Sequence, residues 1–133
     1  MKLAACLLNI SEARRRAVVA GVVGAAVATI EGGQHGAAVL NTFVDTEYNR
    51  SVVTIWWEKC YRELIIIDTR DSGQLPALQD AVVAACEAAA SMIDLRRHEG
   101  GHPRLGAVDL VSIQISRALC SFNQCVICAA FSE

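Results

Sequence analysis

The sequence predicts an α+β fold of the ferredoxin-like type, with a four-stranded antiparallel sheet and two helices on one face. Segments with strand and helix periodicity alternate in the order β-α-β-β-α-β, which is the order of the split βαβ arrangement. The chain has 133 residues, of which 53% are hydrophobic and 20% charged, a size and composition that suit one domain with one core. Right-handed crossovers then give the strand order 4-1-3-2.

The first half of the chain is expected to supply three strands and one helix. Apolar residues recur at helical spacing from Val18 to Ile30. We expect Ser11 to cap this helix and Glu12 to lie in its first turn. Buried or half-buried strands are predicted at 3–8, 37–43 and 50–57. The segment 50–57 is rich in β-branched and aromatic residues, which favour strands.

The second half begins with a segment that fits the pattern poorly. Residues 57–75 are interpreted as an atypical, mostly loop connection. Pro76 suits the first turn of a helix, whose apolar face continues to Ile93 before Gly100 and Gly101 follow. A fourth strand is predicted at 107–115, and an incomplete third helix at 121–133.

Charge and composition exclude some classes of protein. A net charge of −2 gives no general attraction to nucleic acid. The longest apolar run, Ala17 to Ile30, is shorter than the roughly 20 residues that a bilayer requires. The apolar stretch before Asn9 is too short for a secretion signal, so we expect a cytoplasmic chain. The six cysteines are then expected to be reduced, and C-x₄-C-x₂-C from Cys120 lacks the second pair that structural zinc sites use, so no metal is expected.

The predicted topology brings distant polar residues together. The ends of strands 1 and 2 lie at the same edge of the sheet as the starts of strands 3 and 4. This edge collects Asn9, Ser11, Glu12, Asp45, Asn49, Arg50, His102 and Arg104. A plainer explanation, that loops at the ends of sheets are polar in any protein, remains open at this point.

Four segments carry a resemblance to a known family. The most specific is IDLRRHEGGHPRLGAVDL, residues 93–110, in which a His-Pro pair follows two glycines between a helix and a strand. Three other segments support the resemblance only together with this one: LLNISEAR (7–14), NRSVVT (49–54) and CVICAAF (125–131). Together they resemble the N-terminal subdomain of the folate-dependent formiminotransferases, although Ile10 and Ala13 replace that family's usual phenylalanine and glycine.

This resemblance implies a chemistry. The family moves a formimino group from N-formiminoglutamate to N5 of tetrahydrofolate, the co-substrate, in one-carbon metabolism and histidine catabolism. The family's catalytic histidine stands in a Gly-x-His-Pro motif, which here makes His102 the general acid and base. An imidazole exchanges protons near neutral pH, and such transfer typically contributes about 10²–10⁴-fold in rate.

Other roles follow from position and chemistry. Arg50 and Arg104 are predicted to clamp the carboxylates of formiminoglutamate or of the folate tail, because a guanidinium binds a carboxylate bidentately. Asn9, Glu12 and Asp45 are expected to hold the pterin edge or to orient His102. Ser11 and Asn49 complete the predicted substrate and folate set.

Alternatives to this function remain. The resemblance implies that the rest of the subdomain and the second subdomain are missing from these 133 residues, so a non-catalytic interaction or dimerisation module of the same fold is the competing hypothesis. Such a module would cover its sheet with a second copy or with a partner chain. The run Arg14–Arg16 is interpreted either as a solvated face or as an anion site.

Overall fold

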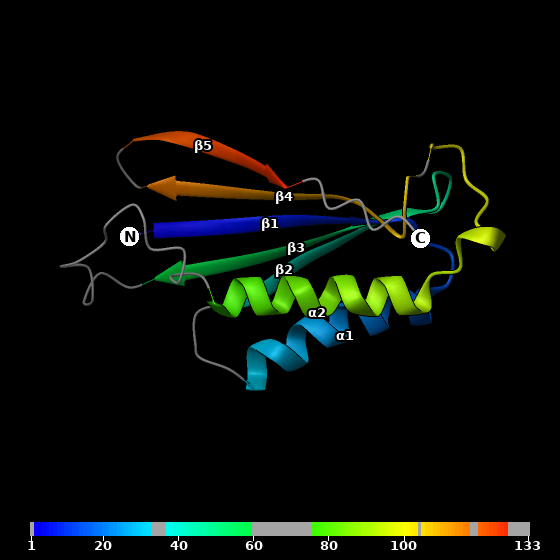
Figure 1. Ribbon diagram of the computed structural model, residues 1–133, viewed down its shortest axis with the longest axis horizontal. Coiled ribbons are helices and arrows are strands. Elements are labelled where there is room, and N and C mark those ends of the chain that lie inside the picture. Colours follow the sequence, from blue (N-terminus) through cyan, green and yellow to red (C-terminus); the bar gives the residue numbers. More distant parts are fainter. Residues whose placement is uncertain (1, 33–36, 60–75, 104, 118–119, 128–133) are drawn as a thin grey trace.

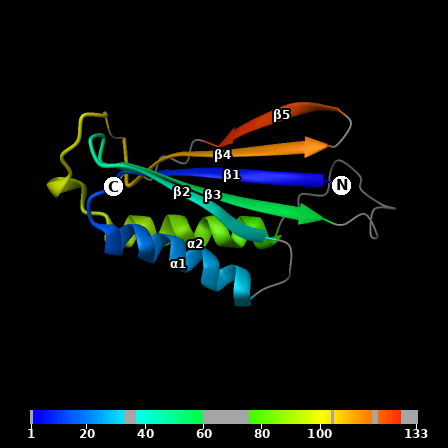
Figure 2. The same ribbon diagram turned by 180° about the vertical axis from the view of Figure 1, so that it is seen from behind.

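The computed structural model describes residues 2–32, 37–59, 76–103, 105–117 and 120–127. Five strands form one antiparallel sheet in the order β2-β3-β1-β4-β5, and two helices pack side by side on one face of it (Figures 1 and 2). The strands are β1 (Lys2–Ile10), β2 (Ala37–Asp45), β3 (Arg50–Lys59), β4 (Val108–Arg117) and β5 (Cys120–Ile127). The helices are α1 (Arg16–Gly32), α2 (Pro76–Met92) and the short 3-10 helix η2 (Leu95–Arg97).

The predicted fold class and strand order are confirmed. The four expected strands lie in the predicted order, and β1 is antiparallel to both β3 and β4. Each strand begins or ends within two residues of its predicted bounds. Of the atypical segment predicted at 57–75, residues 57–59 belong to β3 and residues 60–75 lie outside the described part of the chain.

Two local predictions were wrong. The segment expected to start a third helix forms β5 instead, paired antiparallel with β4 from Val111↔Ile127 to Arg117↔Cys120; residues 128–133 lie outside the described part. The free edge of β4 offers a ladder of hydrogen bonds, which outweighs the weak helical preference of this segment. The predicted start of α1 was the second: the helix begins at Arg16, so Ser11 does not cap it and Glu12 does not lie in its first turn. The Ser11 hydroxyl is held instead by residues near β4.

The core lies between the sheet and the two helices. Cys6, Leu8 and Ile10 alternate along β1 and are fully buried on the helix side of the sheet. Small residues let the helices come close, since a Cβ on Gly21 of α1 would approach Met92 of α2 to 2.5 Å. Further buried apolar residues of the core come from both layers, among them Val22 and Ala26 from α1, Val53 and Ile55 from β3, and Leu78, Ala81, Ala85 and Ala89 from α2.

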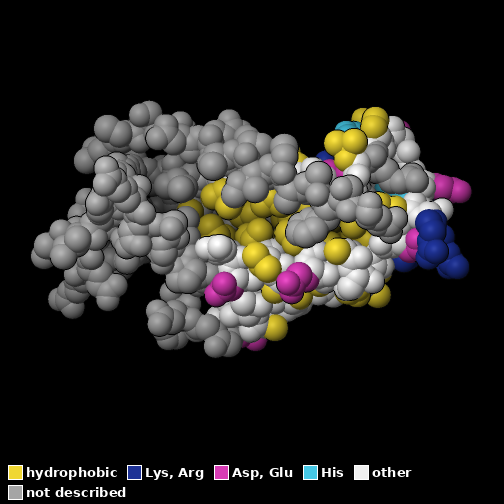
Figure 3. Space-filling model, in the orientation of Figure 1, with side chains coloured by type: hydrophobic (Ala, Val, Ile, Leu, Met, Phe, Trp, Pro, Cys, Tyr) yellow, Lys and Arg dark blue, Asp and Glu magenta, His cyan; other side chains and the backbone are white. Residues whose placement is uncertain are grey.

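The loops converge at one end of the sheet. The β1–α1 loop, the β2–β3 turn and the loop between η2 and β4 lie together there, at the right of Figure 1. The Lys and Arg side chains that are visible in Figure 3 lie at this same end. Among the described residues, no helix is long and apolar enough to cross a membrane.

Candidate functional site

Asn49 joins the three converging loops. Its backbone takes a left-handed conformation with a φ of 51°, and the residue is 5% exposed. The side-chain oxygen accepts hydrogen bonds from the backbone N–H of Ala13 at 2.9 Å and of Arg14 at 3.2 Å, and the Nδ2 donates to the carbonyl of Glu99 at 3.0 Å. Asparagine tolerates a left-handed backbone better than most residues do, so the turn and the bonding pattern select the same residue.

Gly100 lets the histidine loop approach the β2–β3 turn. A Cβ at this position would lie 2.3 Å from the carbonyl oxygen of Tyr48. The next residue, Gly101, donates its N–H to the carbonyl of Glu47 at 3.2 Å. The glycine pair that the sequence singled out therefore fixes the starting point of the His102 loop.

His102 is exposed and its Nδ1 has two partners of opposite kind. Arg50 Nη1 lies 2.9 Å from Nδ1, and the carbonyl oxygen of Pro103 lies 2.6 Å from the same atom. A guanidinium only donates and a carbonyl only accepts, so each contact suits one neutral tautomer of the ring. The ring of Tyr48 is tilted against the imidazole at a centroid distance of 5.6 Å.

Asp109 holds Arg50 in place. Its Oδ2 lies 3.2 Å from Arg50 Nη2, and the two side chains are 6% and 18% exposed. The Oδ1 accepts the backbone N–H groups of Leu105 and Gly106, each at 3.0 Å. Arg50 is thereby tied to the loop that carries the histidine, and its guanidinium points at His102 with little surface left for solvent.

Ser11 and Asp45 serve the framework of the site. The buried Ser11 hydroxyl donates to the carbonyl of Gly106 at 2.8 Å and lies 3.1 Å from Asp109 Oδ2. Asp45 Oδ1 accepts the backbone N–H groups of Glu47 and Tyr48, which closes the β2–β3 turn. Both side chains therefore hold backbone within the site.

Glu12 is buried beneath the β1–α1 loop. Its side chain is nearly solvent-free, and Oε1 accepts three consecutive backbone N–H groups, from Ala13 to Arg15, at 2.9–3.0 Å. Oε2 pairs with Arg15 Nε. Burial raises the pKa of Glu12, but the hydrogen bonds from this backbone and from Arg15 outweigh it, so the pKa lies below its ordinary value.

A cavity of about 230 Å³ opens beside Glu12 and Asn49. Basic side chains of two separate segments line it, Arg14 and Arg15 from the first loop and Arg97 from η2. His98 and Glu99 complete the lining, and His98 Nε2 lies 3.2 Å from the carbonyl of Asn49. The arginine run of the sequence thus contributes to a basic cavity at the convergent end.

The remaining predicted residues lie apart from this cluster. Asn9 is half-buried on β1, and its Nδ2 lies 3.4 Å from the carbonyl of Leu110. By strand alternation it faces away from the helices. Arg104 lies outside the described residues.

Sequence reasoning missed Asp109 and Tyr48. An aspartate at the second position of an apolar strand is a signal for Asp109, because a carboxylate there needs a partner. Tyr48 gave no such signal, since its contact with His102 depends on the turn geometry. Within the described part of the chain, no three His, Cys, Asp or Glu side chains are grouped as a metal site would require.

Comparison with known proteins decides the family. The sequence matches the formiminotransferase domain, N-terminal subdomain, over residues 3–132. The chain belongs to this family. Residues 100–103, Gly-Gly-His-Pro, form the loop that Asn49 and Tyr48 position.

Individual relatives agree. The chain is 28% identical to the formimidoyltransferase-cyclodeaminase of Rattus norvegicus over 133 residues, which is 99% of this chain and 20% of the rat protein. It is 29% identical to the glutamate formimidoyltransferase of Streptococcus pyogenes over 82% of this chain and 29% of that enzyme. It is 32% identical to the Thermoplasma acidophilum enzyme of the same name, over 84% of this chain and 30% of that enzyme. The chain therefore spans between a fifth and three tenths of these relatives.

Proposed function

We propose that this chain forms the histidine-bearing part of a formiminotransferase active site, which acts on N-formiminoglutamate and tetrahydrofolate. Membership of the family and the relatives named glutamate formimidoyltransferase support the reaction class. The observation that carries the proposal is the placement of His102 Nδ1 between Arg50 Nη1 and the carbonyl of Pro103.

This placement supports both proton transfers that the reaction needs. When Nδ1 carries the proton and donates to Pro103, Nε2 has a free lone pair and acts as a base. Once Nε2 has taken a proton, the ring is an imidazolium whose Nδ1–H still donates to Pro103, and Nε2 returns that proton as an acid. The contact with Arg50 suits the other neutral tautomer, in which Nδ1 accepts. A donor and an acceptor at one ring nitrogen thus give each neutral tautomer of His102 a partner.

The proposed steps balance in atoms and charge. The N5 lone pair of tetrahydrofolate attacks the formimino carbon, which forms the N5–C bond and a tetrahedral intermediate, and His102 takes the N5 proton. The proton then passes to the glutamate nitrogen as the bond between that nitrogen and the formimino carbon breaks. The products are 5-formiminotetrahydrofolate and glutamate, and the histidine returns to its first state.

We assign Arg50 to positioning His102. The sequence predicted a carboxylate clamp, but the Arg50 side chain is 18% exposed and its guanidinium is bound to Asp109. The basic cavity beside Asn49 is better placed to receive a substrate carboxylate, because Arg14 and Arg97 line it and each keeps donor groups beyond its hydrogen bond or ion pair.

The test is calorimetric titration of the folded chain with tetrahydrofolate and, separately, with N-formiminoglutamate. Binding is the readout because the chain spans a minor share of its relatives. We expect a dissociation constant below roughly 100 μM for at least tetrahydrofolate, about −5.5 kcal/mol. No heat with either compound up to roughly 1 mM would contradict the proposal and leave the interaction module as the better account.

A matched pair of variants tests the carboxylate assignment. Arg96 and Arg97 both pair with Asp94 and are 88% and 87% exposed, but only Arg97 lines the cavity. We expect Arg97→Gln to weaken binding of formiminoglutamate about three- to tenfold and Arg96→Gln to leave it unchanged. Equal effects of the two substitutions would show that general charge, and not the cavity, attracts the ligand.

A further inference from the structure

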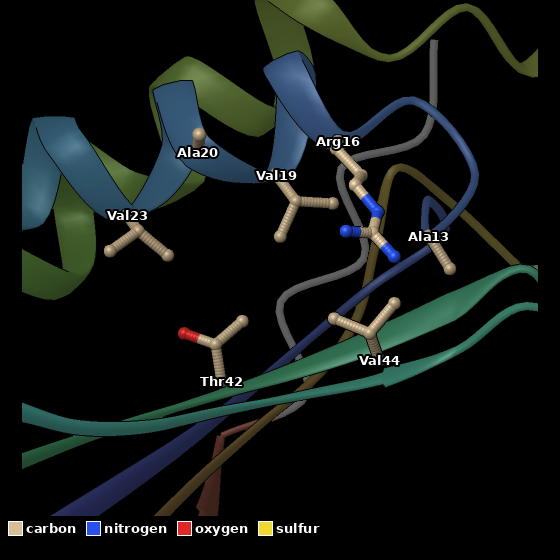
Figure 4. A pocket seen from close by; sticks show the side chains of 7 residues that line it. All are labelled: Ala13, Arg16, Val19, Ala20, Val23, Thr42 and Val44. Carbon is tan, nitrogen blue, oxygen red and sulfur yellow. The ribbon is translucent and has the colours of Figure 1, made fainter.

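A second cavity lies at the β2 edge of the sheet, away from His102. It is an open hollow of about 460 Å³ between the first turns of α1 and β2 (Figure 4). Val19 and Val23 reach from the helix toward Thr42 and Val44 of the strand, as Figure 4 shows. Its lining is apolar apart from Thr42 and the guanidinium of Arg16, which points from α1 toward Val44.

The strand beside this cavity has a free edge. Within the described part of the chain, β2 pairs only with β3 and ends the sheet. Edge strands are commonly protected by lysine, proline or a bulge. The nine residues of β2 include no lysine or proline, and their one register shift lies between Val39 and Asn41, so the stretch from Asn41 to Asp45 is regular.

Apolar side chains are exposed along this edge. Leu40, Phe43 and Val44 are 59%, 58% and 42% exposed. Val44 belongs to the cavity, which a strand added outside β2 would cover. We propose that β2 and the cavity bind an extended peptide segment, which adds to the sheet as a strand and carries an acidic side chain to Arg16.

Strand geometry defines the segment further. Residues opposite Thr42 and Val44 in an antiparallel pair share their face of the sheet, toward α1. The residue opposite Val44 lies beside Arg16, and the residue opposite Thr42 lies over Val19 and Val23. From its N-terminus, the segment therefore has an acidic residue, then any residue, then an apolar residue. Its backbone forms the hydrogen bonds with β2.

Charge complementarity favours such a partner over a second copy of this chain. The only charge on β2 is Asp45, which alternation places on the face opposite to Val44. Its Oδ1 already accepts two backbone N–H groups of the turn. In the described part of the chain no carboxylate is within ion-pair distance of Arg16, and β2 of a second copy would bring no acidic side chain to the cavity side of the sheet.

The probe is a fluorescein-labelled, amidated peptide, Thr-Glu-Thr-Val-Thr-Val, and its matched control has Gln in place of Glu. Fluorescence anisotropy measures binding, and hydrogen exchange of the β2 amides locates it. We expect saturable binding of the Glu peptide, about three- to fivefold tighter than the Gln peptide at low salt, and slower exchange in β2. No binding of the Glu peptide up to roughly 1 mM would overturn the proposal.

Two pairs of variants separate the contributions. Arg16→Gln is expected to remove the preference for the Glu peptide over the Gln peptide. Arg14→Gln is expected to keep this preference, because Arg14 does not line the cavity beside β2. Ala20 is an exposed residue that lines the cavity, and Ala20→Phe is expected to fill the cavity and to weaken binding of the Glu peptide at least tenfold. Ala17 is also exposed but does not line the cavity, so Ala17→Phe is the control. Unchanged melting temperatures establish that the variants fold.

Two further results would contradict the proposal. Equal weakening by Ala20→Phe and Ala17→Phe would place the peptide elsewhere. A wild-type chain that is dimeric by sedimentation, and that Ala20→Phe turns into a monomer, would show that the occupant is a second copy.

Discussion

Asn49 shows how one side chain can assemble a site. Its amide connects the β1–α1 loop to the loop that leads to His102, while its own backbone is left-handed. Glu12 stabilises only the β1–α1 loop, because its carboxylate accepts hydrogen bonds from three backbone N–H groups of that loop. Both residues were predicted as ligand contacts, and in the structure both are buried and hold the backbone.

Replacing Asn49 should separate these roles. Asn49→Gly keeps the left-handed backbone but loses the side-chain hydrogen bonds, whereas Asn49→Ala loses both. We expect Asn49→Ala to lower the free energy of unfolding by about 2–4 kcal/mol and Asn49→Gly by about 1 kcal/mol less. Urea denaturation measures both; an alanine variant as stable as the wild type would contradict this role.

Glu12 should make stability depend on acid pH. A carboxyl whose folded pKa is depressed contributes stability above its unfolded pKa, near 4.5, and loses that contribution as pH falls through the lower, folded pKa. We expect the stability difference between wild type and Glu12→Gln to be largest above pH 4.5 and to shrink below it. Exposed Glu31→Gln controls for net charge; a difference that stays constant with pH would exclude this linkage.

At the scale of the elements, periodicity predicted the order of the first four strands and two helices, because each follows from a local apolar pattern. The β5 strand could not be predicted in this way. Its sequence, CSFNQCVI, has no clear period, and its state follows from the free edge of β4. Ser11 was misassigned for a similar reason, since its partners Gly106 and Asp109 are about a hundred residues away.

The two glycines of the histidine loop should respond differently to alanine. A Cβ on Gly100 would collide with the Tyr48 carbonyl at 2.3 Å, but one on Gly101 would make an ordinary contact with the Tyr48 ring at 3.6 Å. We expect Gly100→Ala to cost about 1–3 kcal/mol and to shift the His102 signals in NMR spectra. Gly101→Ala should cost clearly less, and the reverse order would contradict this loop geometry.

At the scale of the whole molecule, the sheet and helices enclose two thiols. Burial, with a smaller effect of Cys86, raises the pKa of Cys6 to about 12, and burial also raises that of Cys86. Only the thiolate reacts readily. We therefore expect both to resist iodoacetamide at pH 8 in the folded chain and to react once urea unfolds it, as peptide mass spectrometry would show. Fast labelling of either in the folded state would contradict this packing.

The convergence of loops at one end of the sheet was predictable from topology, because the antiparallel order brings those ends together. The roles of the individual side chains within that cluster were not predictable. They depend on which carboxylates accept hydrogen bonds from backbone N–H groups, as those of Asp45 and Glu12 do. They also depend on the ion pair between Arg50 and Asp109, which the sequence did not predict. His102, beside Tyr48, and the basic cavity are both open to solvent at this end.

The most direct test of the central claim is a long-range ¹H–¹⁵N spectrum of the His102 ring, recorded during titration with tetrahydrofolate. The proposal predicts that both ring nitrogens of His102 shift with folate saturation, and that Arg50→Gln alters the ratio of the two neutral tautomers before folate is added. Folate that binds while the His102 nitrogens stay unchanged would contradict the assignment of this histidine as the proton carrier.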